Sequence, residues 1–368
     1  MKIVVLGAGN AGSMTALLYA FYSKKHEHIE IELIHDPNVQ SETVGQATLT
    51  EHPTLLWMGT GFNWYENKIH ATFKSGILYE GWGKINEKIF HPFPSGSMAM
   101  HYCPWEMQKS VLESGYFKVT ESDVVNTDDI DADFIIDCRG KPRDFEGYDL
   151  LNNPTNSTIL GSPNWDMSEQ HWSRHVATPD GWTFVIPTHP DSPSHKFCVG
   201  YCYNDRFTSQ EDAEKNMKNI FDVKINKHLK YKNYVAKKPI DDRIVLSGNK
   251  LFFLEPMESS STHAYLEWAK MVWEYIFNGA ENPSDRMIQY IHQLESFILY
   301  HYQFGSKYNS KFWDYASKLT FDDSLLDRYI DIVKTHDEHD LFPVFSDIDY
   351  GQWHIYSIKN WYDGNTSN

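Results

Sequence analysis

Short apolar runs alternate with longer amphipathic stretches along the first part of the chain. Residues 2–6 (KIVVL) are mostly β-branched and apolar, which predicts a buried strand. Residues 13–22 follow as an apolar run of helical length, and residues 29–34 (IEIELI) predict a second strand. A strand, a helix and a second strand in this order are typical of a parallel βαβ unit, so we expect an α/β fold.

The loop between the first strand and the helix is Gly7-Ala8-Gly9-Asn10-Ala11-Gly12. Glycines at this spacing let the backbone turn tightly and approach a pyrophosphate, whose charge then meets the helix N-terminus. The second strand ends near an acidic residue, as expected for a group that binds a ribose hydroxyl. The pattern predicts dinucleotide binding by Gly7, Ala8, Gly9, Ala11, Gly12, Ser13, His35 and Asp36.

Later segments repeat the pattern of a strand followed by a glycine. Residues 133–140 (DFIIDCRG) and 244–248 (IVLSG) both predict such strands. Apolar periodicity then predicts helices over residues 264–277 and 286–302.

Residues 181–188 (GWTFVIPT) place large apolar side chains at alternate positions. This alternation predicts a strand, and a proline would end it because proline lacks the ladder donor. Two interpretations stay open from the residues alone. The run is an ordinary core strand, or it is a rigid wall beside a binding site formed by Trp182, Phe184, Ile186 and Pro187.

Composition narrows the class of protein. The 368 residues include 12 Trp, 22 Tyr and 21 Phe, enough for a packed core and an aromatic pocket. The formal net charge of −17 repels phosphate backbones, which argues against a nucleic-acid partner. No run approaches the roughly 18–20 apolar residues of a membrane span, so no membrane association is expected.

Four cysteines occur without a CxxC pair, which in a chain of this length indicates reduced thiols and a cytoplasmic location. His336 and His339 form a short HDEH run that resembles metal ligands. Without further ligands nearby in the sequence, a solvated helix face is the better interpretation, and we expect no metal site.

Several motifs closely resemble the flavin-dependent tryptophan halogenases, in the right order over about residues 1–315. That family carries L-E-P-L-E-S-T-G, W-x-W-x-I-P, G-E-A-T, A-T-F-K and H-P-F stretches. This chain has them, with substitutions, at residues 254–261, 182–187, 45–48, 71–74 and 91–93, and a helical family stretch is matched at 297–302 and 312–313.

The resemblance implies FAD, used as FADH2, as the cofactor and a halide ion as co-substrate. O2 and halide would give hypohalous acid, and a tunnel through the wall would deliver it to Lys74 for electrophilic halogenation of an aromatic ring. Glu258 would face Lys74 and take the ring proton. The remaining implied residues are Gln46, Ala47, Gly248, Leu254 and Pro256 for the flavin, Ser260 and Ser261 for the halide, and His91 and Phe93 for substrate stacking.

The resemblance also implies the architecture. We expect a glutathione-reductase-like flavin module over residues 1–270, with substrate-facing segments inserted at about 50–125 and 150–240. Residues 271–368 would form a helical cap. A single glycine fingerprint implies that a separate NAD(P)H-dependent flavin reductase supplies the reduced flavin. The sequence leaves the oligomeric state open, including a homo-oligomer.

Departures from the family concern the substrate and the halide. The C-terminal part is short and offers no recognisable counterpart of the late aromatic segments that close over tryptophan, so we expect a free indole, phenol or heteroaromatic instead. Ser261 replaces a family glycine, which favours bromide or iodide over chloride. Two alternatives stay open: an aromatic monooxygenase on the same fold, and a flavin-binding protein without catalysis.

Overall fold

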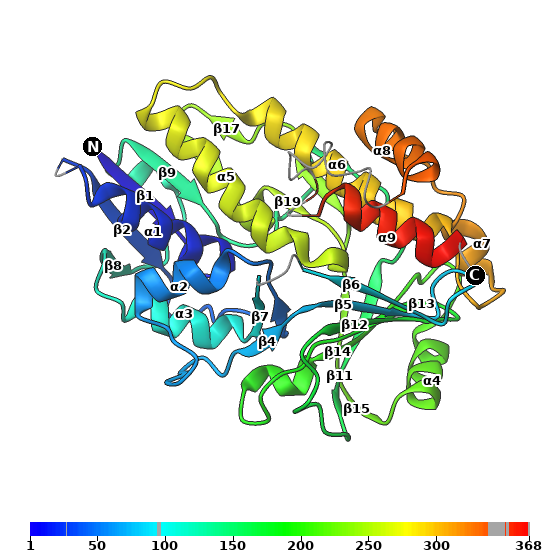
Figure 1. Cartoon of the computed structure of the whole chain (residues 1–368). Helices are drawn as coiled ribbons and strands as arrows, with labels where there is room; N and C mark the ends of the chain where they lie inside the picture. Colours follow the sequence, from blue (N-terminus) through cyan, green and yellow to red (C-terminus); the bar gives the residue numbers. More distant parts are fainter. Residues whose placement is uncertain (27, 94–96, 338–349, 351–352, 367–368) are drawn as a thin grey trace.

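The computed structural model describes residues 1–26, 28–93, 97–337, 350 and 353–366. Two large sheets lie side by side, and most of the helices cover them on one side (Figure 1). A mostly parallel sheet carries the first loop, and a larger, mostly antiparallel sheet lies beside it.

The parallel sheet is the βαβ unit that the sequence predicts, extended on both sides. Its order is β17-β18-β9-β1-β2-β8, and only β17 pairs antiparallel to its neighbour. Its strands are β1 (Lys2–Leu6), β2 (Glu30–His35), β8 (Lys118–Glu121), β9 (Phe134–Asp137), β17 (Ile240–Asp241) and β18 (Ile244–Leu246). The strand predicted at 244–248 therefore lies beside the one predicted at 133–140, and both sit next to the N-terminal strand.

Four helices flank this sheet: α1 (Asn10–Ser23), α2 (His52–Thr60), α3 (Pro104–Leu112) and α5 (Ser260–Phe277). The Tyr19 hydroxyl in α1 donates to the Ala269 carbonyl in α5 at 2.9 Å, which fixes the two helices against each other. The predicted helix at 264–277 was too short. It begins four residues earlier, because Ser260 and the residues that follow it already have helical geometry.

The larger sheet has the order β15-β11-β14-β13-β12-β5-β6. Its strands are β5 (Gly76–Glu80), β6 (Lys88–Pro92), β11 (Ser157–Pro163), β12 (Ser173–Thr178), β13 (Gly181–Val185), β14 (Val199–Tyr203) and β15 (Val223–Lys230), and α4 (Gln210–Ile220) lies beside it. Small sheets join β3 (Gln46–Ala47), β7 (Ala99–Tyr102) and β4 (Thr72–Lys74), and β10 (Tyr148–Leu150), β16 (Tyr234–Ala236) and β19 (Phe252–Phe253).

The last part of the chain is helical, with α6 (Ser284–Gln303), α7 (Lys311–Ala316), α8 (Ser324–Thr335) and α9 (Ile355–Thr366). Helix α9 lies against β6, where Asn360 donates to the Phe90 carbonyl at 2.9 Å (Figure 1). Within the described residues, none of the helices has the length and apolarity that crossing a membrane requires. His336 is exposed just beyond α8, and His339 lies outside the described residues.

Candidate active site

The first loop has the geometry that its glycines predict. Gly7 adopts a φ of 91°, and a Cβ on Gly12 would lie 1.8 Å from the Gly7 carbonyl oxygen. Gly9 precedes α1, whose first turn has no acidic residue and no capping side chain, and a Cβ there would meet open space. An uncapped, uncharged helix start with room in front of it fits a pyrophosphate group.

The end of β2 supplies the adjacent polar groups. The His35 Nδ1 atom is buried and has no hydrogen-bond partner among the described residues, whereas Asp36 Oδ1 already accepts from the backbone and side chain of Asn38. Both side chains stay candidates for the ribose hydroxyl. A Cβ on Gly248 would lie 2.7 Å from the Ala11 Cβ, so the late glycine packs against the start of α1. These residues fit a bound dinucleotide such as FAD.

The flavin-side segment after β2 leads to the predicted lysine. Gly45 lies close to Ile186 and Thr188, and Gln46–Ala47 form β3, which pairs with β7. The next residue, Thr48, accepts a hydrogen bond at 3.0 Å from the Lys74 ammonium. Leu254 and Pro256 follow β19, and Leu254 is buried.

Lys74 ends β4 and is completely buried. Burial lowers the pKa of its ammonium to about 7, and the negative charge of Glu258 opposes this shift. The Nζ atom also lies 5.1 Å from the centroid of the Phe93 ring. A lysine with this pKa is partly neutral near pH 7, whereas surface lysines are almost fully protonated there.

Glu258 is also completely buried, in a turn where its φ is +64°. Burial alone would raise its pKa, but the neighbouring His301 and His91 hold the pKa of this carboxyl well below its usual value. Its Oε1 atom lies 2.7 Å from His301 Nε2 and 3.7 Å from His91 Nδ1, and it accepts from the Tyr79 hydroxyl. The site therefore holds a buried carboxylate near a buried lysine.

The expected direct contact of Lys74 with Glu258 is not observed. No ion pair within 4 Å joins them among the described side chains. The ammonium donates instead to the Ser259 hydroxyl at 2.8 Å. The positive φ of Glu258 and of Ser259, at 64° and 56°, turns the glutamate toward the histidines and the serine toward the lysine. The charges of Lys74 and Glu258 therefore interact at a distance, and the residue that contacts the ammonium is Ser259, next to Glu258 in the chain.

Ser260 and Ser261 occupy the first turn of α5, as the sequence placed them. This helix start also lacks a side-chain cap and an acidic residue in its first turn. Ser260 is buried and Ser261 is half-buried. Free backbone N–H groups at such a position suit an anion.

The predicted stacking platform is covered by a residue that the sequence did not single out. His91 and Phe93 are buried side by side, and the indole of Trp353 stacks on both, with centroid distances of 4.3 Å and 5.1 Å. Its Nε1 atom donates to the Glu258 carbonyl at 3.0 Å. The C-terminal part therefore does supply an aromatic residue to the site. The only signal in the sequence was a tryptophan near the C-terminal end of the chain.

The predicted wall is a buried strand with a polar tether. Trp182 and Phe184 lie in β13, and Phe184 packs directly on Gly200 of the neighbouring strand. Further along, the Pro187 carbonyl accepts from the Thr72 hydroxyl at 2.7 Å. Ile186 and Pro187 therefore lie between the segment at Gly45 and the strand that carries Lys74. Trp182 and Phe184 lie deeper, as the core interpretation would also have them.

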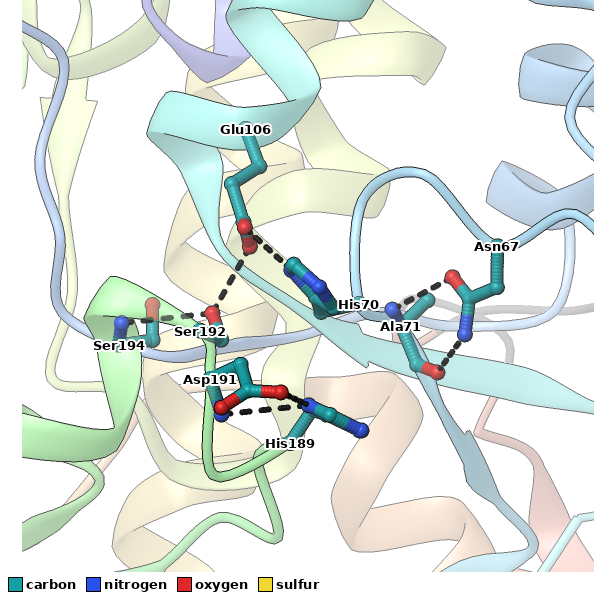
Figure 2. Close-up of polar contacts among 8 residues, drawn as sticks. All are labelled: Asn67, His70, Ala71, Glu106, His189, Asp191, Ser192 and Ser194. Atoms are coloured by element: carbon teal, nitrogen blue, oxygen red, sulfur yellow. Dashed lines mark hydrogen bonds and ion pairs between the residues drawn. The ribbon is translucent and has the colours of Figure 1, made fainter.

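A polar cluster connects the segment before β4 with the loop after Pro187 (Figure 2). Glu106 of α3 contacts His70 Nδ1 at 2.5 Å and accepts from the Ser192 hydroxyl at 2.8 Å. Asn67 closes the preceding turn through two hydrogen bonds with Ala71, at 2.7 Å and 2.8 Å. The entrance to β4 and the loop after Pro187 are thus tied to the same helix, which fixes Lys74 relative to the wall.

Comparisons with known proteins identify the family of this chain. The family model described as tryptophan halogenase matches residues 2–114 and 106–363. Tryptophan 7-halogenase KtzQ of Kutzneria sp. (strain 744) is 22% identical over 220 residues, which is 54% of this chain but only 40% of that protein.

Solved structures share the fold. Tryptophan 6-halogenase SttH of Streptomyces toxytricini superposes with a TM-score of 0.77 at 18% identity, over 100% of this chain and 90% of that one. BrvH, a flavin-dependent halogenase of Brevundimonas sp. BAL3, gives 0.78 at 16% identity, over 99% and 89%. With a family model that matches nearly the whole chain, this protein belongs to the tryptophan halogenase family of flavin-dependent halogenases.

Proposed function

We propose that this chain halogenates a free, electron-rich aromatic molecule (an indole, phenol or heteroaromatic) by electrophilic substitution. Residues 1–270 would hold FAD, with the substrate-facing segments at about 50–125 and 150–240 inserted, and residues 271–368 would cap the site. When bound, reduced FAD with O2 and halide supplies hypohalous acid. A separate NAD(P)H-dependent reductase would provide the FADH2.

The observation that carries the proposal is Lys74. Lys74 is completely buried, has a pKa near 7 and lies beside an aromatic platform and a buried carboxylate. Burying its charge costs stability, and groups with such shifted pKa values cluster at functional sites. Its ammonium form can donate a hydrogen bond to hypohalous acid and make the halogen more electrophilic. Its neutral form can take the halogen as a haloamine. Both forms are accessible near neutral pH, and both roles stay open.

The other residues would control where the halogen goes. Backbone N–H groups at Ser260 and Ser261 would hold the halide. Ile186 and Pro187, with Trp182 and Phe184 behind them, would form the walls of a tunnel that excludes water and keeps the aromatic substrate away from the flavin. His91 and Phe93 would stack on the substrate ring after the Trp353 side chain has moved away from them.

Glu258 would complete the substitution. The ring carbon forms a bond to the halogen while the halogen–oxygen bond of hypohalous acid breaks, and the departing hydroxide takes a proton from the Lys74 ammonium to give water. In the haloamine alternative, the nitrogen–halogen bond of the protonated haloamine breaks and leaves the neutral Lys74 amine. The positive charge that develops on the ring is stabilised by the carboxylate. The C–H bond at that carbon then breaks, its electrons return to the ring, and the proton moves to Glu258.

The test is a reaction without any reductase. Purified protein is mixed with chemically reduced FAD, O2, bromide and a panel of indoles and phenols, and the products are analysed by mass spectrometry. Brominated products above those of a protein-free control support the proposal. Hydroxylated products would identify a monooxygenase, and flavin binding without product would identify a binding protein.

A further inference from the structure

His301 is a completely buried histidine whose two ring nitrogens both face oxygen acceptors. Nδ1 lies 2.7 Å from the Phe297 carbonyl oxygen within α6, and Nε2 lies 2.7 Å from Glu258 Oε1. A carbonyl oxygen only accepts, so Nδ1 must carry a proton. The contact between Nε2 and Oε1 has the distance of an ion pair but not the alignment of a hydrogen bond. A bare Nε2 at 2.7 Å from a carboxylate oxygen would still be repelled, so this ion pair also requires a proton.

The two carboxylate oxygens of Glu258 have different surroundings. Oε1 is held by His301 and by the Tyr79 hydroxyl, whereas Oε2 is buried and has no hydrogen-bond partner among the described residues. A buried carboxylate oxygen without a partner is costly and therefore uncommon. It is also the atom that is free to receive a proton. The asymmetry divides one carboxylate into an anchored oxygen and an available oxygen.

The neighbourhood keeps His301 in this orientation. Its ring stacks on Tyr79 at 5.4 Å and packs against Trp361 at 4.5 Å with the two rings tilted by 42°. The ionisable groups that face the carboxylate come from five elements and are Lys74 (β4), Tyr79 (β5), His91 (β6), His175 (β12) and His301 (α6). Of these side chains, His301 and Tyr79 make the close contacts with Oε1.

We propose that His301 is the positioning residue of Glu258: protonated on both ring nitrogens, it holds Oε1 together with Tyr79, so that Oε2 accepts the proton that leaves the aromatic ring. This role rests on the proposed halogenase function. The proton on His301 does not leave during the step. It stabilises the carboxylate before transfer, and the transferred proton resides on Oε2 until solvent or product removes it.

Nuclear magnetic resonance tests the pairing without any turnover. In protein labelled with ¹⁵N-histidine, His301 is expected to show two protonated ring nitrogens at neutral pH. In Glu258→Gln the Nε2 signal should change to that of a bare nitrogen. His301→Phe assigns the signal, and His52, a buried histidine of α2, should keep its signals in Glu258→Gln. A bare Nε2 in the wild-type protein would overturn the proposal, and so would a metal ion held by His91, Glu258 and His301.

Kinetics tests the effect on proton transfer. His301→Gln is expected to lower kcat at least tenfold, with little change in KM. A substrate deuterated at the reacting ring position should then show a primary isotope effect that the wild type lacks, because proton removal has become slow. His52→Gln is the matched control and should show neither change. If His301→Gln turns over at the wild-type rate without an isotope effect, the positioning role is wrong. If the wild type makes no halogenated product while the magnetic resonance result holds, only the proposed function fails.

Discussion

The ammonium of Lys74 lies 2.8 Å from the hydroxyl oxygen of Ser259, the residue that directly follows Glu258. The lysine comes from β4 and the serine from the start of α5, 185 positions away in the chain. The contact joins the small sheet of β3, β7 and β4 to helix α5, which covers the parallel sheet. It also gives Lys74 a neutral partner, which leaves the Glu258 carboxylate to His301 and Tyr79.

Burial of Lys74 should make the protein more stable at high pH. In the folded protein its pKa is about 7, against 10.5 for a free lysine. Below pH 7 the lysine is charged in both states and the folded state bears the whole cost, on the order of 3–5 kcal/mol. Between pH 7 and 10.5 the unfolded state binds more protons, so the free energy of unfolding from this group rises with pH. Lys74→Met is therefore expected to be more stable than wild type at pH 6, by about 2–4 kcal/mol, and by less at pH 9.

Urea denaturation at the two pH values measures this difference. Lys84→Met, at an exposed lysine, is the control and should change little. Equal stability of Lys74→Met and wild type at pH 6 would show that the lysine is not buried as a charge.

Removal of Trp353 should open the site. Its indole covers both His91 and Phe93, so an aromatic substrate has to displace it or push it aside. Trp353→Ala is expected to lower KM for indoles and to admit bulkier rings, at a stability cost of about 3–5 kcal/mol. Trp353→Phe keeps a ring but lacks the N–H that donates to Glu258, and its KM should lie between those of the wild type and Trp353→Ala. A higher KM in Trp353→Ala would mean that the indole helps to bind the substrate.

The halide site can be tested by competition. Ser261 lies in the first turn of α5, where the family has glycine, and its side chain changes the size and polarity beside the free N–H groups. Bromide and iodide are easier to oxidise and to dehydrate than chloride. With equal chloride and bromide, we expect at least as much brominated as chlorinated product, and a higher share of chloride in Ser261→Gly. Mass spectrometry gives the ratio. A mixture dominated by chlorinated product in the wild type would contradict this expectation.

We expect that a separate reductase is needed, because the parallel sheet carries a single glycine loop. No second fingerprint of that type occurs in the sequence, so NADH with FAD should give no turnover in protein freed of reductase. Oxidation of NADH is followed by absorbance, and addition of a flavin reductase should restore product. Turnover without the reductase would show that the protein has a nicotinamide site of its own.

Local sequence predicted the parts of the molecule that depend on local physics. The loop from Gly7 to Gly12 needs glycine for its turn and for the close approach to α1, and these needs leave a fixed pattern in the sequence. The late strand at 244–246 has an apolar run and a following glycine, which placed it near the same loop. Lys74 and Glu258 were found through motifs, and the structure brings both into one buried region.

The partners of these residues could not be predicted. Whether Lys74 contacts Glu258 or Ser259 depends on two positive φ angles in a turn without glycine, which the sequence does not signal. His301 lies in the helical stretch at 297–302 that resembles the family, but this motif did not indicate a contact with Glu258, which depends on how the helix packs. Trp353 lies beyond the region of recognisable motifs, and a single tryptophan has no periodicity that would indicate its place.

The most direct measurement compares wild type with Lys74→Ala and Lys74→Met in the assay with chemically reduced FAD, O2 and bromide. Flavin binding and peroxide formation are recorded in the same samples, together with the brominated product. We expect the wild type to brominate at least one indole or phenol, and both variants to lose bromination by a factor of 100 or more while they still bind flavin and form peroxide. Bromination at the wild-type rate in either variant would contradict the proposed role of Lys74.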